Sequence, residues 1–525
     1  MADFKTRAAH FLRRTAQSLS PSLSRRSYEA ASQSPRMMGL RASHADGNSE
    51  ALSGVATMRD RSRKMERDQA FAKKAIRQFA LDQVGEGIRP QFVTGADKTE
   101  RILSELWDSF AEQCDPLNGG TFYGLQFQGV AALARDGGVL NRKRPRRLTD
   151  TDFWGRRLAV PLQLQMLEMD HLDTSKDGTV AASQGGVIVG GIELDAAGRR
   201  SGYWLYRQHP ASVLPFQRPG ALNSVFVPYT EIAHTFCYNE SRPGQIIGAP
   251  WLHAAITRLY DFDGWVDATM HLRRQTASAP ILISGGDAWD EEERLAAGFP
   301  QGKDEYGNDI PQRGAVDNRG YPVETWQPGL AIIAPPGRKI EVPTLPTVPG
   351  HEETTRVTLR EIAAAAGMSY EALSNDLSGS NYVSLRLGRI ERRQLNDAFR
   401  EQVTIPLFCK PTGHWFLDTV QLAGLYRPTR DPVKTFWIAK QAEDVDELLR
   451  VKIIAAKIRN NLMSWDEAVI GEGCDPEQLA QEIKRSNERR DTYSIVGDCD
   501  ARQMTAAGQP VNTKPAGQKP PITKS

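Results

Sequence analysis

The sequence predicts an α+β fold that is mainly helical and divided into several domains. The chain has 525 residues, which is too long for a single hydrophobic core. Apolar residues recur at helical spacing from Met58 onward, whereas residues 158–172 alternate apolar and polar side chains as a half-buried strand does. Helices followed by an antiparallel sheet are typical of an α+β domain, which we expect over residues 58–248.

The helices are predicted from apolar spacing, capping residues and terminal glycines. They cover residues 58–84, 100–113, 123–136, 252–277 and 383–403. A further helix is capped by Thr358 and Glu361 and ended by Gly367, and two more follow the caps Ser464 and Asp475. The long helix that starts at Val383 is expected to break near Pro406.

The strands are predicted in the first half of the chain. Residues 185–210 form two strands around an Asp-Ala-Ala-Gly turn, and the β-rich region continues to about Tyr238. Residues 284–350 are dense in proline and glycine, with strand-like pieces at 330–335 and 339–345. They indicate a small, loop-rich module inserted between helices.

The ends of the chain and its cysteines suggest a protein of a reducing compartment. Residues 1–55 are basic and rich in serine and alanine, which favours a mostly disordered arm over a transit peptide. The tail from about Arg502 should also be disordered. The five cysteines are scattered without a C-x-x-C pair, which fits reduced thiols and assembly in the cytosol.

Composition excludes a bulk polycation and a membrane protein. Hydrophobic residues make up 40% of the chain and charged residues 25%, and the formal net charge is only +2. Contacts with nucleic acid must therefore come from local patches. No apolar run of about 18 residues is present, so we expect no membrane span.

Motifs for nucleotide hydrolysis, metalloproteolysis and serine hydrolysis are missing. The only Gly-Lys pair, Gly302-Lys303, precedes an aspartate, so no P-loop exists, and neither H-E-x-x-H nor G-x-S-x-G occurs. The nine histidines lie singly, which does not support metal ligation. Asp170, Asp173 and Asp177 faintly resemble a cation loop, but their spacing favours a turn that closes a strand.

The basic run RKRPRR at 142–147 leaves several interpretations open. It could bind phosphate, act as a nuclear signal or donate ion pairs between subunits. A run this short is most often a solvated loop, which is the interpretation we favour.

The stretch SNDLSGSNYVSLRLGRIERRQ at 374–394 carries the strongest candidate site. Its polar, glycine-containing half consists of Asn375, Asp376, Leu377, Ser378, Gly379, Ser380, Asn381 and Tyr382. A serine nucleophile would need a base, yet no histidine lies between His351 and His414. Asp376 also has no nearby carboxylate partner for two-metal chemistry. Contact with a polymer requires only donors and acceptors on a mobile backbone, so we favour that role.

The arginines after this loop form a stripe on the predicted helix. Arg386, Arg389, Arg393 and Arg400 fall within about 60° of arc at helical spacing. The apolar side chains that lie mainly on the opposite side are Leu387, Leu395, Ala398, Phe399 and Val403. A solvated face would explain the stripe, and the adjoining polar loop favours a binding role instead.

Several motifs in a fixed order resemble those of the lambda-type portal proteins of tailed bacteriophages. These motifs are VGEGIRP at 84–90, FYGLQFQGVAALARDGGVL at 122–140, LQLQMLEMDHLD at 162–173, GGIELDAAGR at 190–199, HTFCYNESRPGQIIGAPWL at 234–252, LREIAAAAGMSYEALSNDLSGSNYVSLRLGRIE at 359–391, RDPVK at 430–434 and GEGCDPEQLAQEIKRSNE at 471–488. The resemblance covers about residues 58–490. It departs from the family where N-Y-S-S is Asn381-Tyr382-Val383-Ser384 here, which favours a structural role for position 383.

The resemblance implies a division into the parts of a portal fold. These are a basic arm (1–55), a wing (56–248), a stem helix (249–283), a clip (284–350), a second stem helix (351–368), a tunnel loop (369–383), a long helix with a return to the wing (384–434), a helical crown (435–495) and a tail (496–525).

The resemblance also implies the function and the partners. A portal protein forms a homo-oligomeric ring, usually of twelve subunits, at the unique capsid vertex, where double-stranded DNA is packaged and ejected. The implied partners are the terminase, the major capsid and scaffold proteins, and the head-completion or tail connector proteins. No catalysis, cofactor or membrane is implied, and assembly takes place in the host bacterial cytoplasm.

The arginine stripe would face either the channel or a neighbouring subunit. The alternatives are a terminase-like packaging enzyme, which would need a nucleotide loop or clustered acids, and a generic head–tail adaptor.

Overall fold

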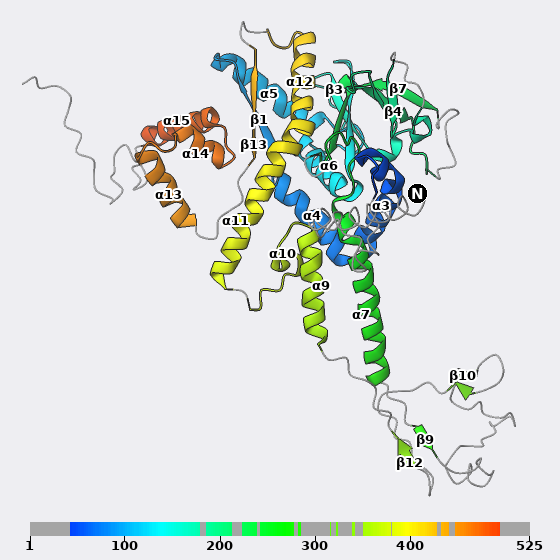
Figure 1. The fold of residues 1–525 in the computed structure, drawn as a ribbon. Helices are drawn as coiled ribbons and strands as arrows, with labels where there is room; N and C mark the ends of the chain where they lie inside the picture. The colour runs from blue at the N-terminus through cyan, green and yellow to red at the C-terminus, as the bar shows by residue number, and fades with distance from the viewer. Residues whose placement is uncertain are drawn as a thin grey trace, which may run out of the picture.

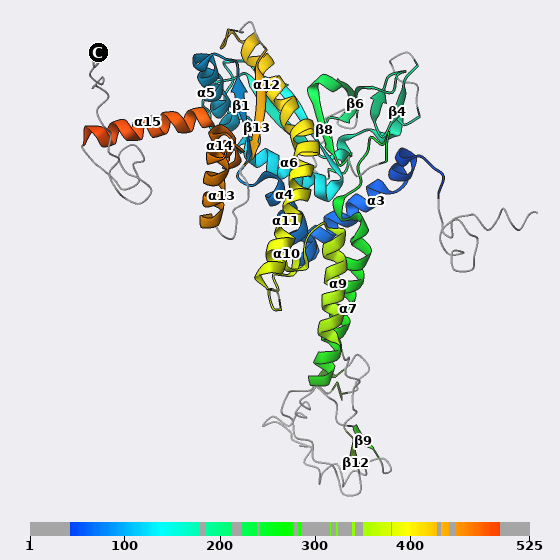
Figure 2. The same ribbon diagram turned by 60° about the vertical axis from the view of Figure 1, so that its left-hand side comes forward.

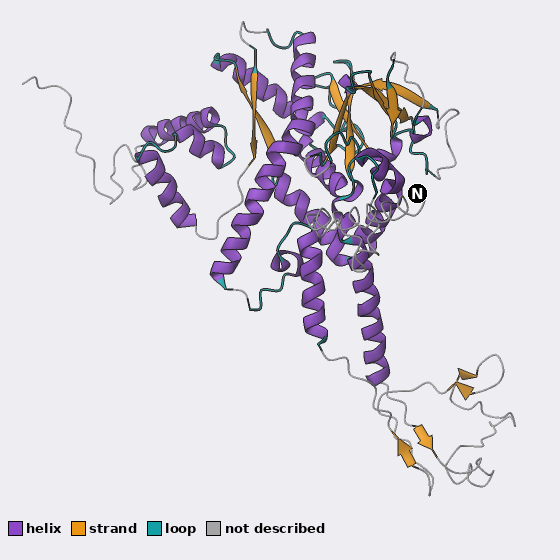
Figure 3. Ribbon diagram, in the orientation of Figure 1, coloured by secondary structure: helices purple, strands orange, loops and turns teal. Residues whose placement is uncertain are grey.

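The computed structural model describes most of the chain as helices and antiparallel sheets. The described residues are 43–178, 185–212, 223–238, 242–277, 350–379, 381–427, 432–439 and 447–493, with the short strands at 282–284, 315–316, 322–323 and 339–341. Figure 1 shows a body of helices and sheets from which helices α7 and α9 project side by side. Figure 2 gives the same arrangement from another side, and Figure 3 marks the helices and strands by colour. The predicted mixed, mainly helical class is confirmed.

The first described helices start earlier than the sequence predicts. Helix α3 spans Gly47–Asp68, and α4 spans Ala70–Val84. The side chain of Asp46 accepts a hydrogen bond from the Asn48 amide and caps α3, so residues 47–55 are helical and the prediction of disorder is wrong there. The predicted single helix is broken at Gln69, whose backbone is extended (φ −118°). The rest of the predicted arm, residues 1–42, lies outside the described residues.

Helices α5 (Asp97–Gln113) and α6 (Phe122–Asp136) confirm two predicted helices within about three residues. Gly137 ends α6 in the left-handed region (φ 83°), where an added Cβ would clash with the backbone near Gly248. Around α5 and α6 an aromatic core gathers, with Trp107, Phe122 and Phe416 each 2% exposed or less. Beside it, β1 (Ile88–Val93) pairs antiparallel with β13 (Lys434–Ala439), which joins distant parts of the sequence.

Two larger antiparallel sheets form the other end of the body. Their orders are β3–β2–β8 and β4–β5–β6–β7. The strands are β2 (Gly138–Pro145), β3 (Leu162–Leu167), β4 (Val187–Val189), β5 (Ile192–Leu194), β6 (Arg200–Tyr206), β7 (Ser224–Pro228) and β8 (Ile232–Phe236), with 3-10 turns η2 (Met169–His171), η3 (Thr174–Lys176) and η4 (Tyr229–Glu231).

The sheets confirm some strand predictions and correct others. The turn between β5 and β6 is the predicted one, whereas the strand predicted at 158–172 is only β3. The basic run at 142–147 is not a loop. Its first four residues belong to β2, because β3 and β8 supply hydrogen-bonding partners on both sides of that strand.

The two projecting helices pack on each other and on the body. The 3-10 turn η5 (Trp251–Ala254) leads into α7 (Ile256–Ala277), and α9 spans His351–Ala365. An ion pair of 3.2 Å joins Arg258 of α7 to Glu361 of α9. Helix α9 starts directly after Gly350, which adopts a left-handed backbone (φ 80°). Thr358 thus lies inside the helix, and the predicted capping box there is wrong.

The long helix continues past Pro406. Helix α10 (Tyr370–Ser374) and a loop lead into α11 (Tyr382–Phe399), then a π-helix (Arg400–Cys409) and α12 (Lys410–Leu422). Proline lacks an amide donor and would kink an α-helix. The wider π-helical turn accommodates it, so the predicted break is wrong.

The C-terminal helices are α13 (Glu447–Arg459), α14 (Trp465–Gly471) and α15 (Pro476–Thr492). Ser464 and Asp475 cap the last two through their side chains, as predicted. The short pairs β9 (Leu282–Ser284) with β12 (Lys339–Glu341) and β10 (Ala315–Val316) with β11 (Pro322–Val323) are the described parts of the predicted module. The piece at 330–335 and the tail from 494 lie outside the described residues.

Candidate channel loop and the helix that carries it

The predicted loop connects α10 to α11 at the edge of the body. Figure 1 shows it at the lower end of α11, away from the sheets. Ser380 lies outside the described residues, and Tyr382 is the first residue of α11. Leu377 is 60% exposed, and Gly379 has a left-handed backbone (φ 80°) with open space around it.

Asp376 organises the loop from within. Its carboxylate accepts hydrogen bonds from the Ser378 amide at 3.0 Å and from the Tyr370 hydroxyl at 2.8 Å. The Arg356 guanidinium lies 3.8 Å away. The hydrogen bond from the Ser378 hydroxyl, followed by the one from Tyr370, lowers the pKa of Asp376 to about 2. Asp376 is therefore ionised at neutral pH and cannot supply a proton as a general acid.

The two asparagines of the loop terminate helices. Asn375 adopts the left-handed backbone (φ 59°) at the end of α10, and its side-chain oxygen accepts a hydrogen bond from Lys74. The Asn381 side chain accepts from the Ser384 amide at 2.8 Å and caps α11. Three of the predicted polar residues thus shape the loop, and Leu377 and Gly379 are the parts presented outward.

The four predicted arginines do not share one environment. Arg386 and Arg389 are exposed on the first turns of α11, and Arg393 lies 3.7 Å from Asp397 on the same helix. Arg400, with only 12% of its side chain exposed, donates hydrogen bonds of 2.8 Å to the carbonyls of Asp82 and Gln83. Those carbonyls belong to the last turn of α4, so Arg400 ties α11 to α4.

Sequence reasoning missed Arg392, which points away from the stripe. Its Nε lies 2.6 Å from the carboxylate of Asp82, and the side chains of Gln83 and Asn396 hydrogen-bond beside it at 3.1 Å. Helical spacing places Arg392 on the inner face of α11. Its partner is 310 residues away along the chain, so local sequence offered no signal for the pair.

The outer face of α11 is apolar, which also differs from expectation. Val383, Leu387 and Ile390 are 71%, 66% and 47% exposed, at the i, i+4 and i+7 spacing of one helix face. Leu387 and Leu395 were expected on the side opposite the arginines, and both are exposed, Leu395 at 43%. Phe399 and Val403 are buried, as expected for that side. We call Val383, Leu387 and Ile390 the apolar stripe.

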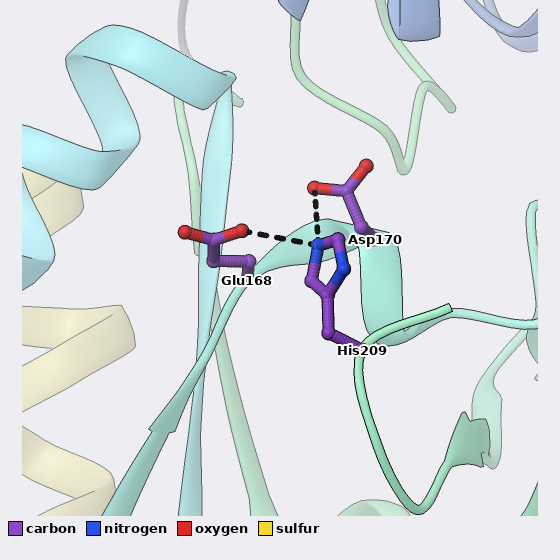
Figure 4. A group of neighbouring side chains, drawn as sticks. All are labelled: Glu168, Asp170 and His209. Carbon is purple, nitrogen blue, oxygen red and sulfur yellow. Dashed lines mark ion pairs between the residues drawn. The ribbon is translucent and has the colours of Figure 1, made fainter. Parts of the chain in front are cut away.

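A second cluster of ionisable side chains lies between α3 and the sheets. Figure 4 shows His209 pointing at two carboxylates, with its Nε2 3.4 Å from Glu168 and 3.9 Å from Asp170. Arg63 contacts the same carboxylates at 3.1 and 2.5 Å, and Arg59 contacts Asp170 at 2.9 Å. These guanidinium groups occupy the oxygens that a metal ion would need. The cluster therefore fits an ion-pair network that fastens α3 better than a metal site.

The aspartates of the suspected cation loop have structural roles. Asp173 caps the 3-10 turn η3 and accepts a hydrogen bond of 2.6 Å from the Tyr206 hydroxyl. Asp177 accepts 2.9 Å from the Gly191 amide. The interpretation of this segment as a turn is confirmed. Within the described parts of the chain, no helix is long and apolar enough to cross a membrane.

Comparison with known proteins defines the class as phage portal proteins. The model of the lambda family of phage portal proteins matches residues 33–400. The chain belongs to this family. Proteins of this class sit in the virion at the capsid vertex.

The chain is also similar to one curated phage protein and to two solved structures. A probable portal protein of Halomonas phage phiHAP-1 is 25% identical over 456 residues, which cover 82% of this chain and 80% of that protein. Two solved chains, from the neck of an empty gene transfer agent particle and from the native virion of such a particle, are 14% identical and cover 81% and 82% of this chain. The matches cover 94% and 99% of those two chains, with TM-scores of 0.44 and 0.43.

Proposed function

We propose that this portal protein forms a closed ring and that double-stranded DNA passes through the ring's channel beside the loop at 375–381. The wing, stem, clip, tunnel loop and crown expected from the sequence describe its parts. The ring acts as a conduit and an assembly platform without catalysis of its own. It docks the terminase during packaging and the head-completion or tail connector proteins afterwards, and it contacts the capsid and scaffold proteins during assembly in the bacterial cytoplasm.

The observation that carries ring formation is the apolar stripe of α11. An isolated helix is marginally stable in water, and most of its stability in proteins comes from packing of its apolar face. The stripe lies opposite the inner face, where Asn396 and Phe399 are buried against α4. No described part of the chain covers it. We infer that a second copy of the chain does, and copies applied repeatedly around an axis close a ring.

A weakly attractive loop suits the passage of DNA. Each phosphate that a protein neutralises adds affinity and salt dependence, so a strongly basic channel would retain the DNA. The outward residues Leu377 and Gly379 are uncharged, and the charge of Asp376 repels phosphate. Arg386 and Arg389, which have no ion-pair partner among the described residues, supply limited attraction behind the loop.

Mass measurement and negative-stain microscopy of the purified full chain test the ring. We expect a particle of many subunits, near twelve, with a central hole. A protein that stays monomeric at every salt concentration, also with scaffold and capsid proteins added, would overturn the proposal. DNA-stimulated ATP hydrolysis would instead indicate a packaging enzyme.

A further inference from the structure

A pocket at the edge of the β3–β2–β8 sheet combines arginines with apolar walls. It has a volume of about 400 Å³ and lies between the turn after α5 and the ends of β2 and β3. Arg144 and Arg146 line one side, and Leu125, Leu164 and Met166 are among its apolar walls. Leu117 stands at its rim and is 77% exposed. None of these residues belongs to the loop or to α11.

The arginines of the pocket have no acidic partner in the described residues. Arg142 and Arg144 lie on one face of β2 because side chains alternate along a strand, and Arg146 follows directly after its end. Arg142 lies 3.7 Å from Glu231. Arg144 donates instead to the amide oxygen of Gln165 at 2.7 Å, and Arg146 donates to that of Gln163 at 2.8 Å.

The one carboxylate in the pocket wall is already engaged. Asp115 accepts hydrogen bonds from the amides of Leu117 at 2.9 Å and of Asn118 and Gly120 at 3.3 Å. It therefore holds the turn after α5 and forms no ion pair with either arginine in the described residues. Burial lowers the pKa of Arg144, and repulsion from Arg142 and Arg146 lowers it further. The pocket thus holds two arginines, Arg144 and Arg146, that donate to glutamine amides and not to a carboxylate among the described residues.

The lining indicates which anion fits. The planar guanidinium group can form paired hydrogen bonds with either a carboxylate or a phosphate. The sugar–phosphate backbone of DNA offers much less apolar surface for Leu117, Leu125 and Met166 than a peptide, which has apolar side chains next to its carboxylates. Glutamine amides that hold the arginines in place reduce the flexibility that binding would otherwise have to remove.

We propose that this pocket docks a polypeptide segment of another protein of the virion, in which an acidic side chain lies beside an apolar one. The carboxylate binds Arg144 and Arg146, and the apolar neighbour packs on Leu117 and Met166. The docking is independent of the ring channel and of the loop, so it stands whether or not DNA passes there.

Binding of a fluorescein-labelled octapeptide of alternating glutamate and leucine to the full chain tests this docking. We expect R144Q/R146Q to weaken binding by about tenfold or more, since two charge-assisted contacts are lost. The control R147Q removes one arginine charge from an exposed position outside the pocket and should bind as the wild type does. A peptide of alternating glutamine and leucine should not bind.

A second variant keeps the test decisive if the double substitution impairs folding. L117E places a carboxylate at the rim of the pocket, where it competes for the arginines, and it should also reduce peptide binding about tenfold. Equal loss with R147Q, or equal competition by a DNA duplex, would show unspecific charge attraction and overturn the proposal. Loss of the protein's own oligomer in R144Q/R146Q would identify the occupant as a second copy and overturn it as well.

Discussion

Among single residues, His234 is the one whose protonation is most clearly controlled by its surroundings. It lies on β8 at 3% exposure, with its ring 5.0 Å from that of Phe236 and 5.9 Å from that of Tyr203. Neither ring nitrogen has a hydrogen-bond partner in the described structure. Burial, and secondly the charge of Arg200, lower the pKa of His234 well below its ordinary value.

The buried His234 predicts that the sheet loses stability in acid. The unfolded histidine binds a proton below about pH 6.5, whereas the folded one stays neutral. Proton binding therefore stabilises the unfolded state as the pH falls, and the free energy of unfolding decreases. The loss has a limiting slope of about 1.4 kcal/mol per pH unit. Hydrogen exchange of the β8 amides between about pH 7.5 and 5 measures it. H234L should show a shallower pH dependence, and an unchanged slope in that variant would contradict the prediction.

Residue roles were predictable from the sequence only where they depend on neighbours along the chain. Ser464 and Asp475 were recognised as helix caps because a cap bonds to amides two or three residues later, whereas Asn381, which caps α11, was predicted only as a loop residue. The role of Arg400 could not be predicted, since helical spacing aligns it with Arg386 while its hydrogen bonds go to α4, more than 300 residues earlier.

At the scale of elements, α11 has three faces with different tasks. The inner face packs on α4 through Arg392, Asn396 and Phe399. The arginine face lies to one side, and the apolar stripe lies outward. Periodicity placed Leu387 opposite the arginine face but could not show that it is exposed, because a sequence does not reveal that the first turns of α11 extend beyond the body.

The apolar stripe predicts a variant that folds but does not assemble. Burial of one Val, Leu or Ile side chain contributes about 1.5–3 kcal/mol, so V383S/L387S/I390S should weaken every contact between subunits by several kcal/mol. We expect monomers by light scattering with an unchanged far-ultraviolet circular dichroism spectrum. The control L422S alters a leucine that is 86% exposed at the end of α12 and should assemble normally. A ring of full mass from the triple variant would show that another face joins the subunits.

Elements were predicted best where local chemistry decides them. The glycine ends of α4 and α6 and the turn between β5 and β6 were found from short motifs. The start of α9 and the passage through Pro406 were missed, since packing against α7 and a switch to π-helical bonding override the local preference.

For the whole molecule, the connections between distant segments define the architecture. β1 pairs with β13 across most of the chain, and the ion pairs of Arg59 and Arg63 fasten α3 to the segment around Asp170. The sequence predicted the class and the order of the parts through composition and motif order. It could not predict these contacts, because each joins residues between which no local pattern exists.

The separation of the loop from these connections predicts that the loop can be shortened without loss of the ring. Deletion of Leu377–Ser380 removes the outward residues but keeps Asn381, whose side chain caps α11. The apolar stripe and the bond between Arg392 and Asp82 also remain, so assembly should be normal by mass and microscopy. We expect heads built with this variant to retain less packaged DNA, measured as nuclease-protected DNA per head. The matched variant L377S/S378A, which keeps the loop length, should retain more. A deletion variant that forms no ring would show that the loop is an assembly element, and normal DNA retention would show that it does not contact the DNA.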